Sequence, residues 1–162
     1  MNESQAEIYD FLAQRSLAVA GASRSGKKMG NAILKVLKEK GYNVFPIHPE
    51  AESLEGTQCY HSLESLPEKV GGIVICLPSI QTEKVLAEAL SAGIGRVWMQ
   101  QGAESYAALR FCEKNGIQAV HGRCLLMFVE PVESIHKFHR WIWKLLGKYP
   151  AQSAPPNSIV HP

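Results

Sequence analysis

Five short apolar runs alternate with segments of helical periodicity, and this alternation restricts the fold more than any other feature of the sequence. The runs are rich in Val and Ile and end at Gly, Pro or polar residues, which is typical of buried parallel strands. They span residues 16–22, 42–49, 71–78, 96–100 and 117–122. The chain is therefore expected to build a five-stranded sheet.

Three segments between these runs place apolar residues on one face, as amphipathic helices do. They cover residues 30–41, 80–93 and 104–116, and each closes on a glycine suited to a helix C-terminus: Gly41, Gly93 and Gly116. Strands that alternate with helices form right-handed βαβ crossovers. The sequence therefore predicts an α/β fold: a doubly wound, mostly parallel, five-stranded Rossmann-like sheet with helices on both faces.

The rest of the chain has weaker patterns. Residues 50–70 predict a long excursion with one helical turn near Leu63. Residues 132–150 predict a C-terminal helix, basic and rich in Trp, that packs on the domain and supports a homodimer, with a membrane-surface helix as the alternative. The Pro- and Ser-rich end predicts a disordered tail. We expect one domain over residues 1–148 and a tail over 149–162.

Composition narrows the classes of function. The chain has 162 residues and a formal net charge of only +2, which does not suggest nucleic acid as a partner. Its four cysteines show no C-x-x-C spacing, so reduced thiols are favoured over disulfides or a zinc site. The first residues lack the apolar core of a signal peptide, and no apolar run reaches membrane-spanning length. We expect a soluble, cytoplasmic protein.

The segment GASRSGKKMG, residues 21–30, follows the first predicted strand and leads into the first helix. In an open parallel sheet, ligands bind at the carboxyl ends of the strands, and a helix N-terminus there attracts anions. Its glycines allow tight turns, and Arg24, Lys27 and Lys28 supply positive charge. The pattern favours an anionic ligand, with a turn that only joins strand to helix as the alternative.

Two phosphate-binding motifs overlap this segment, and neither is complete. GASRSGK matches G-x-x-x-x-G-K-[ST] except at the last position, where Lys28 replaces the hydroxyl that holds magnesium. The dinucleotide fingerprint lacks its glycine spacing, and residues 47–49 offer no acid for the ribose. Glu50 and Glu52 lie just beyond, so an NAD(P)-binding oxidoreductase stays open as an alternative.

Four segments carry a resemblance to a known family, in this order: GASRSGKKMGNAILKVLKEKGYNVFPIHP, LEGTQCYHSLESLP, VWMQQG and HGRC. Through them the chain resembles the small CoA-binding proteins whose fold matches the CoA-binding domain of the succinyl-CoA synthetase α subunit. The resemblance covers about residues 16–124 and implies CoA or acyl-CoA as the ligand. It does not extend to a phosphohistidine domain, so we expect no ligase activity.

The resemblance also implies which residues border the ligand. The phosphate loop is expected to use Gly21, Ala22, Ser23, Lys27 and Gly30, with Arg24 and Lys28 as further cations. His48 and Pro49 are expected beside the nucleotide, and Leu77, Pro78 and Ser79 beside the adenine. The thiol end is expected at Gln100, Gln101, Gly102, Arg123 and Cys124.

The chemistry of these residues agrees with such a ligand. CoA carries a diphosphate and a separate 3′-phosphate, which suit a helix N-terminus with several cations. His48, His61 and His121 are expected on the ligand side, but no triad or metal pattern accompanies them, so binding or structural roles are favoured over catalysis. Arg123 would lower the pKa of the Cys124 thiol, whereas a packed, inert cysteine is the interpretation we favour.

The sequence therefore predicts a protein that binds CoA or an acyl-CoA and performs no chemistry alone, as a carrier, a sensor or a partner subunit of an enzyme. An NAD(P)-linked oxidoreductase is the first alternative. A structural interaction module whose loop binds only adventitious anions is the second.

Overall fold

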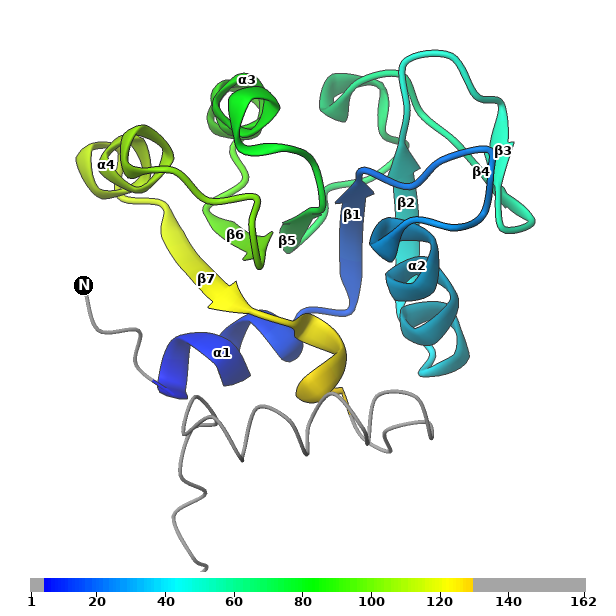
Figure 1. Cartoon of the computed structure of the whole chain (residues 1–162), viewed down its shortest axis with the longest axis horizontal. Helices are drawn as coiled ribbons and strands as arrows, with labels where there is room; N and C mark the ends of the chain where they lie inside the picture. Colours follow the sequence, from blue (N-terminus) through cyan, green and yellow to red (C-terminus); the bar gives the residue numbers. More distant parts are fainter. Residues whose placement is uncertain (1–4, 130–162) are drawn as a thin grey trace, which may run out of the picture.

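The structure, a computed structural model, describes residues 5–129. Five parallel strands form its central sheet (Figure 1). They are β1 (Ser16–Ala20), β2 (Asn43–Ile47), β5 (Gly72–Ile75), β6 (Arg96–Gln100) and β7 (Gln118–Arg123), in the order β2-β1-β5-β6-β7. The chain winds outward from β1 to β2, then returns to the other side of β1 and continues to β7. This confirms the predicted doubly wound α/β fold.

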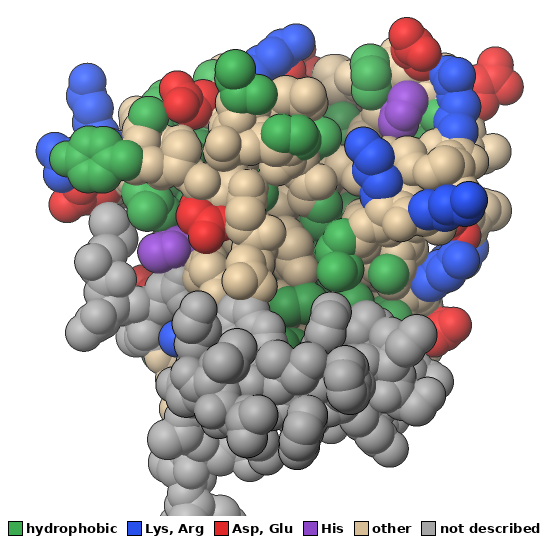
Figure 2. Space-filling model, viewed as in Figure 1, with side chains coloured by type: hydrophobic (Ala, Val, Ile, Leu, Met, Phe, Trp, Pro, Cys, Tyr) green, Lys and Arg blue, Asp and Glu red, His purple; other side chains and the backbone are tan. Residues whose placement is uncertain are grey.

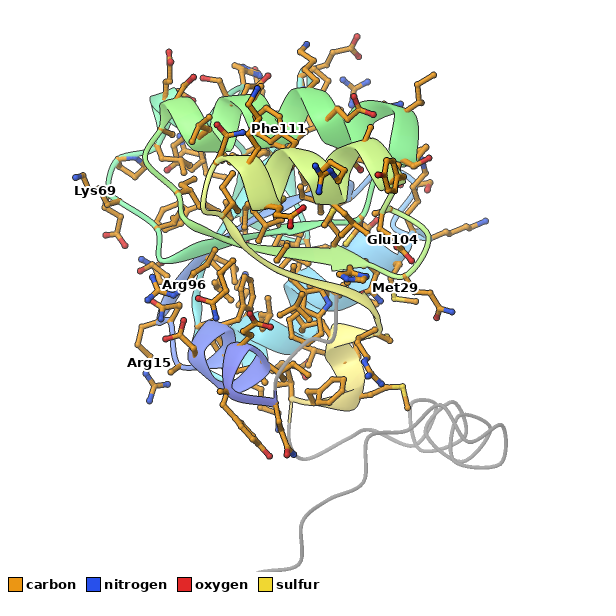
Figure 3. All side chains as sticks on the ribbon, turned by 90° about the vertical axis from the view of Figure 1, so that its left-hand side faces the viewer. Arg15, Met29, Lys69, Arg96, Glu104 and Phe111 are labelled. Carbon is orange, nitrogen blue, oxygen red and sulfur yellow. The ribbon has the colours of Figure 1, made fainter. Side chains whose placement is uncertain are left out.

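Helices cover both faces of the sheet, as Figure 3 shows in side view. On one face lie α1 (Gln5–Leu12), α2 (Met29–Glu39) and the 3₁₀ turn η2 (Leu125–Met127). On the other face lie α3 (Ser79–Ser91), α4 (Tyr106–Lys114) and the 3₁₀ turn η1 (Leu63–Ser65). The predicted three helices and the helical turn near Leu63 are therefore present.

Side chains of β1 show why the sheet needs both layers. Successive strand residues point to opposite faces. Leu17 and Val19 belong to the apolar core under α1 and α2, whereas Ala18 and Ala20 belong to the core under α3 and α4. Such strands are buried on both faces, so they appear in the sequence as continuous apolar runs rather than alternating ones.

Helix α1 is absent from the sequence-based prediction. Only Ile8 and Phe11 of its eight residues are buried, and two apolar positions are too few to reveal a period. Tertiary packing holds the helix instead, because Phe11 meets Trp98 of β6 edge to face at 5.6 Å between ring centroids.

The excursion between β2 and β5 contains more pairing than its sequence indicates. A small antiparallel hairpin joins β3 (Ser53–Leu54) to β4 (Thr57–Gln58). Further on, Tyr60 pairs in parallel with Ile47 at the outer edge of β2, and its backbone N–H donates to the Pro46 carbonyl at 2.9 Å. This segment therefore runs beside the end of β2.

Glycines end three helices as predicted. Gly41, Gly93 and Gly116 follow α2, α3 and α4 with φ of +82°, +74° and +66°, the left-handed region in which glycine carries no Cβ penalty. The predicted C-terminal helix, its dimer contact and the tail lie outside the described residues. Among residues 5–129, no helix combines the length and apolar character needed to cross a bilayer.

Candidate functional site

Two adjoining cavities open where the winding direction of the sheet reverses, at the carboxyl ends of β1 and β5. One, here called the loop cavity, has a volume of about 510 Å³ and is lined by the turn after β1, the end of β2 and one side of α3. The other, here called the cysteine cavity, measures about 490 Å³ and reaches toward the ends of β6 and β7. Lys28 and Leu77 line both cavities, so a long ligand can extend from one into the other. This is the position at which open parallel sheets bind ligands.

Two glycines bring the elements of the site into close contact. A Cβ on Gly21 would lie 2.4 Å from the carbonyl oxygen of Cys76, and Gly21 has φ of +108°. A Cβ on Gly30 would lie 2.5 Å from the backbone nitrogen of Ala22. The turn after β1 therefore packs against the end of β5, and the first turn of α2 packs against that turn.

A buried amide fixes the loop that joins β1 to α2. Asn31, in the first turn of α2, is only 1% exposed. Its Oδ1 accepts a hydrogen bond from the Ser23 backbone N–H at 3.0 Å, and its Nδ2 donates to the Ser23 carbonyl at 2.8 Å. The same Nδ2 donates to Glu55 at 2.9 Å. Sequence analysis missed this residue, although an Asn on the apolar side of a helix was a signal for it.

Glu55 extends this network into the hairpin. It occupies the β3–β4 turn with φ of +50° and pairs with Lys35 of α2 at 3.2 Å. The hydrogen bond from Asn31 is the largest influence on its carboxyl and lowers its pKa, and Lys35 lowers the pKa further. An ionised carboxylate therefore ties the loop and α2 to the hairpin.

Of the three loop cations, Lys28 is the one that lines both cavities. It is the N-cap of α2, and no side chain among residues 5–129 caps this helix end by a hydrogen bond. The positive end of the helix dipole and the Lys28 side chain therefore face the junction of the two cavities. The arrangement favours an anionic group at this junction.

The other two loop cations lie elsewhere. Arg24 pairs with Glu50 at 3.2 Å, and both side chains are mostly exposed. Lys27 lines neither cavity. Figure 2 shows Lys and Arg side chains interspersed with Asp and Glu on the side of the molecule that carries α2. The sequence alone did not indicate which of Arg24, Lys27 and Lys28 lines the cavities.

The remaining predicted residues divide between the cavities. The loop cavity contains Gly21, Ala22, Ser23, His48 and Pro49, and also His61. The cysteine cavity contains Pro78, Gln100, Gln101, Gly102 and Cys124. Pro49 and Pro78 therefore line different cavities. Gly30, Ser79, Arg123 and His121 line neither one.

A bulge in β7 positions the far wall of the cysteine cavity. Trp98 of β6 pairs with Val120, but Gln100 pairs with Arg123, so β7 has one extra residue between these pairs. The buried Gln100 side chain then accepts a hydrogen bond from the Leu125 backbone N–H at 3.1 Å. The bulge brings the segment after β7, with Cys124, over the end of β6.

The mouth of this cavity is shaped by the turn after β6. The Gly102 backbone N–H donates to Glu104 Oε2 at 2.8 Å, and the buried Thr82 hydroxyl of α3 donates to the Ala103 carbonyl at 2.7 Å. Met29, at the start of α2, lines the same cavity, and Figure 3 labels Met29 and Glu104 near the same edge of the sheet.

Two thiols line the cysteine cavity. Burial raises the pKa of the Cys76 thiol to about 12, and the neighbouring Cys124 contributes to this shift. Burial also raises the pKa of Cys124, opposed by hydrogen bonds from Gln100 and from the backbone of Leu126 and Met127. The raised pKa of Cys124 agrees with the packed, inert cysteine that the sequence analysis favours. All four cysteines are free thiols, as predicted.

Comparisons with known proteins relate this chain to a protein family. A family model described as a CoA binding domain matches residues 15–130. The chain is 35% identical over 80 residues to the ADP-forming acetate–CoA ligase of Methanocaldococcus jannaschii, covering 49% of this chain and 11% of that protein. It spans between 11% and 18% of the length of three such ligases and 28% of the α subunit of a fourth.

Shorter proteins match over nearly their whole length. The uncharacterized protein YneT of Bacillus subtilis is 26% identical over 126 residues, covering 76% of this chain and 93% of that protein. Among solved structures, a conserved hypothetical protein from Pyrococcus furiosus has 42% identity and a TM-score of 0.65, covering 68% of this chain and 96% of that chain.

Proposed function

Because the chain belongs to the family of CoA-binding domains, we propose that it binds CoA or an acyl-CoA across the two cavities and catalyses no reaction by itself. The observation that carries this proposal is the position of Lys28 and the α2 N-terminus at the junction of the loop cavity and the cysteine cavity.

The shape of the site supports CoA in a defined orientation. CoA is a long molecule with a nucleotide at one end, a diphosphate next to it and a thiol at the other end. In the proposed orientation the nucleotide occupies the loop cavity, the diphosphate meets Lys28 and the α2 N-terminus, and the pantetheine arm enters the cysteine cavity. The thiol then lies near Cys76 and Cys124.

The proposed role is that of a carrier, a sensor or a partner subunit. The acetate–CoA ligases and the ligase α subunit among its relatives are much longer, and this chain matches only 11–28% of their length. A Lys also stands at position 28, where a phosphate loop that hydrolyses nucleotides places the hydroxyl that holds magnesium. The absence of this hydroxyl supports binding without nucleotide hydrolysis.

Ligand-induced stabilisation tests the proposal against its alternatives. CoA at one hundred times its Kd is expected to add about 2.7 kcal/mol to the free energy of unfolding, which raises the Tm by several degrees. NAD and NADP at the same concentration are expected to leave the Tm unchanged. A larger shift with NAD would favour the oxidoreductase, and no shift with any of these ligands would favour the interaction module.

A turnover assay tests the non-catalytic part of the proposal. The protein is incubated with CoA, ATP, magnesium and acetate, and acetyl-CoA is measured by chromatography. We expect no acetyl-CoA above the level formed without protein. Formation of acetyl-CoA that disappears on replacing His48 would contradict the proposal.

A further inference from the structure

His48 and His61 lie side by side in the loop cavity although they are thirteen positions apart in the sequence. The parallel pairing of Ile47 with Tyr60 aligns the two segments, so the residue that follows each partner comes next to the other. A backbone hydrogen bond from His48 to the Tyr60 carbonyl, 2.9 Å long, continues the pairing. Both histidines line the loop cavity.

Backbone contacts orient both imidazole rings through Nδ1. The Nδ1 of His48 accepts hydrogen bonds from the backbone N–H groups of Glu50, at 3.1 Å, and Ala51, at 2.9 Å. The proton of the neutral His48 ring is therefore on Nε2, which makes that atom a donor. The Nδ1 of His61 contacts the His48 carbonyl at 3.1 Å, and because a carbonyl only accepts, this Nδ1 carries a proton. In both rings these backbone contacts involve Nδ1 and not Nε2.

Lys84 of α3 adds a positive charge to the same cavity from the opposite wall. The cavity also contains one carboxylate of α3, Glu88. Glu88 follows Lys84 by one helical turn, which places it about 6 Å further along the helix axis, away from the end of the sheet where α3 begins. Glu50 is paired with Arg24 at 3.2 Å and does not line the cavity. The charged side chains that line the loop cavity are therefore two lysines, Lys28 and Lys84, and one carboxylate, Glu88.

CoA needs a second anion-binding site in addition to the one at the α2 N-terminus. Its diphosphate and its 3′-phosphate are separate groups, and one helix N-terminus serves only one of them. The 3′-phosphate is a phosphate monoester with a charge between −1.5 and −2 at pH 7, so it needs a cation and hydrogen-bond donors away from Lys28. Arg24 and Lys27 do not line the loop cavity, whereas Lys84 and the two imidazoles do.

We propose that His48, His61 and Lys84 form a phosphate-monoester subsite, distinct from the diphosphate position at α2, through which the chain distinguishes CoA from dephospho-CoA. The subsite rests on the proposed function, because it takes the nucleotide end of CoA to occupy the loop cavity. Lys84 supplies the point charge, and His48 Nε2–H supplies a donor whose direction is fixed before the ligand arrives. His61, whose Nδ1–H already donates to the His48 carbonyl, donates from Nε2 as the doubly protonated imidazolium.

Calorimetric titration with CoA and with dephospho-CoA tests this subsite. Dephospho-CoA keeps the adenine and the diphosphate but lacks the 3′-phosphate. Wild type is expected to bind CoA at least tenfold more tightly than dephospho-CoA. Lys84→Ala is expected to weaken CoA binding about ten- to a hundredfold, the effect of losing a charge-assisted hydrogen bond, and to leave dephospho-CoA binding unchanged. Lys27→Ala, an exposed cation outside both cavities, is the matched control and is expected to change neither affinity by more than about twofold.

Asparagine variants separate the binding role of the histidines from their structural role. In His48→Asn the short amide still offers an oxygen to the Glu50 and Ala51 N–H groups but has no atom at the Nε2 position. In His61→Asn the amide nitrogen still reaches the His48 carbonyl. Both variants are expected to keep the wild-type Tm and to lose affinity for CoA but not for dephospho-CoA.

The results distinguish a failure of the phosphate-monoester subsite from a failure of the proposed function. If wild type binds both ligands equally well, the subsite is wrong and the proposed function stands. If Lys84→Ala weakens both ligands equally, Lys84 serves the diphosphate or acts at long range, and the subsite is again wrong. If wild type binds neither ligand at millimolar concentration, the proposed function itself is wrong.

Discussion

Asn31 holds the backbone of Ser23 from both sides, through a 3.0 Å hydrogen bond that its Oδ1 accepts and a 2.8 Å hydrogen bond that its Nδ2 donates. Both contacts come from one planar amide in the first turn of α2. The position of the loop relative to the helix N-terminus is therefore determined by the helix itself. Because the same amide also donates to Glu55 at 2.9 Å, the hairpin shares this constraint.

Replacing Asn31 is expected to loosen the site and the fold together. Asn31→Ala leaves the Ser23 N–H without its partner, whereas the Ser23 carbonyl keeps the Gly26 N–H and Glu55 keeps Lys35. An unsatisfied buried polar group costs about 1–3 kcal/mol. We expect a loss of that size in the free energy of unfolding, measured by urea denaturation, and weaker CoA binding. Asn31→Asp keeps an acceptor for the Ser23 N–H but adds a carboxylate next to Glu55, so it is expected to be no better. Wild-type stability and affinity in Asn31→Ala would contradict the clamp.

Gly21 is expected to be irreplaceable because of a contact and not only because of its backbone angle. A Cβ at Gly21 would lie 2.4 Å from the Cys76 carbonyl oxygen, whereas a Cβ at Gly102, which also has positive φ, would meet nothing within 4 Å. Gly102→Ala is expected to cost about 1–2 kcal/mol from the left-handed backbone alone. Gly21→Ala is expected to cost well above that or to prevent folding. Equal losses in the two variants, by urea denaturation, would show that the contact between β1 and β5 contributes little.

The Glu55 network predicts a specific pH dependence. The pKa of Glu55 is lowered below its ordinary value of 4.5 in the folded protein, mainly by the Asn31 hydrogen bond. A lowered pKa means that the ionised carboxylate stabilises the fold above pH 4.5 and that this contribution is lost as the pH falls through the folded pKa.

Glu55→Gln isolates this contribution, because the amide still offers an acceptor to Asn31 but carries no charge for Lys35. The difference in unfolding free energy between wild type and Glu55→Gln is expected to be constant above about pH 6 and to shrink as the pH falls toward 3. Urea denaturation at a series of pH values measures it. A difference that stays constant down to pH 3 would mean that Glu55 titrates alike in the folded and unfolded chain.

Cys124 is expected to be the preferred site of a mixed disulfide with CoA. Burial raises the pKa of both thiols of the cysteine cavity. Hydrogen bonds from Gln100 and two backbone groups oppose the rise at Cys124, whereas the pKa of Cys76 is raised to about 12. In the exchange, the Cys124 thiolate attacks one sulfur of CoA disulfide, a protein–CoA disulfide forms, and the other CoA leaves as a thiolate that takes up a proton.

Mass spectrometry of protein incubated with CoA disulfide measures this preference. The adduct is expected on Cys124 ahead of Cys59, Cys76 and Cys112, and Cys124→Ser is expected to abolish most of it. No adduct, or an even distribution over the four cysteines, would place Cys124 among the packed, inert thiols.

The sequence predicted the parts of the fold that depend on local patterns. Ile73, Val74 and Ile75 form a fully buried strand inside a predicted apolar run, and the glycines after three helices have the expected left-handed backbone. Helix α1 was missed because its stability comes from packing on Trp98, a residue almost ninety positions away. The pairing of Tyr60 with Ile47 was missed because one bridge carries no periodicity.

The candidate site was predicted in the same uneven way. The loop was found because a glycine-rich turn between a strand and a helix is a local signal. The sequence did not predict that Lys28, Lys27 and Arg24 take separate positions. Adjacent residues in a loop point in directions that only the folded chain determines. Lys84 was missed because a lysine on an exposed helix face resembles any solvated lysine until the cavity beneath it is known.

The central claim is that CoA phosphates bind at the N-terminus of α2. The most direct test is calorimetric titration of CoA into wild type, Lys28→Ala and Lys27→Ala. The two variants remove the same charge from adjacent positions, but only Lys28 lines the cavities. We expect Lys28→Ala to bind CoA about ten- to a hundredfold more weakly than wild type and Lys27→Ala to bind it within about twofold, with the larger loss persisting at high salt. Wild-type affinity in Lys28→Ala, or equal losses in both variants, would contradict the claim.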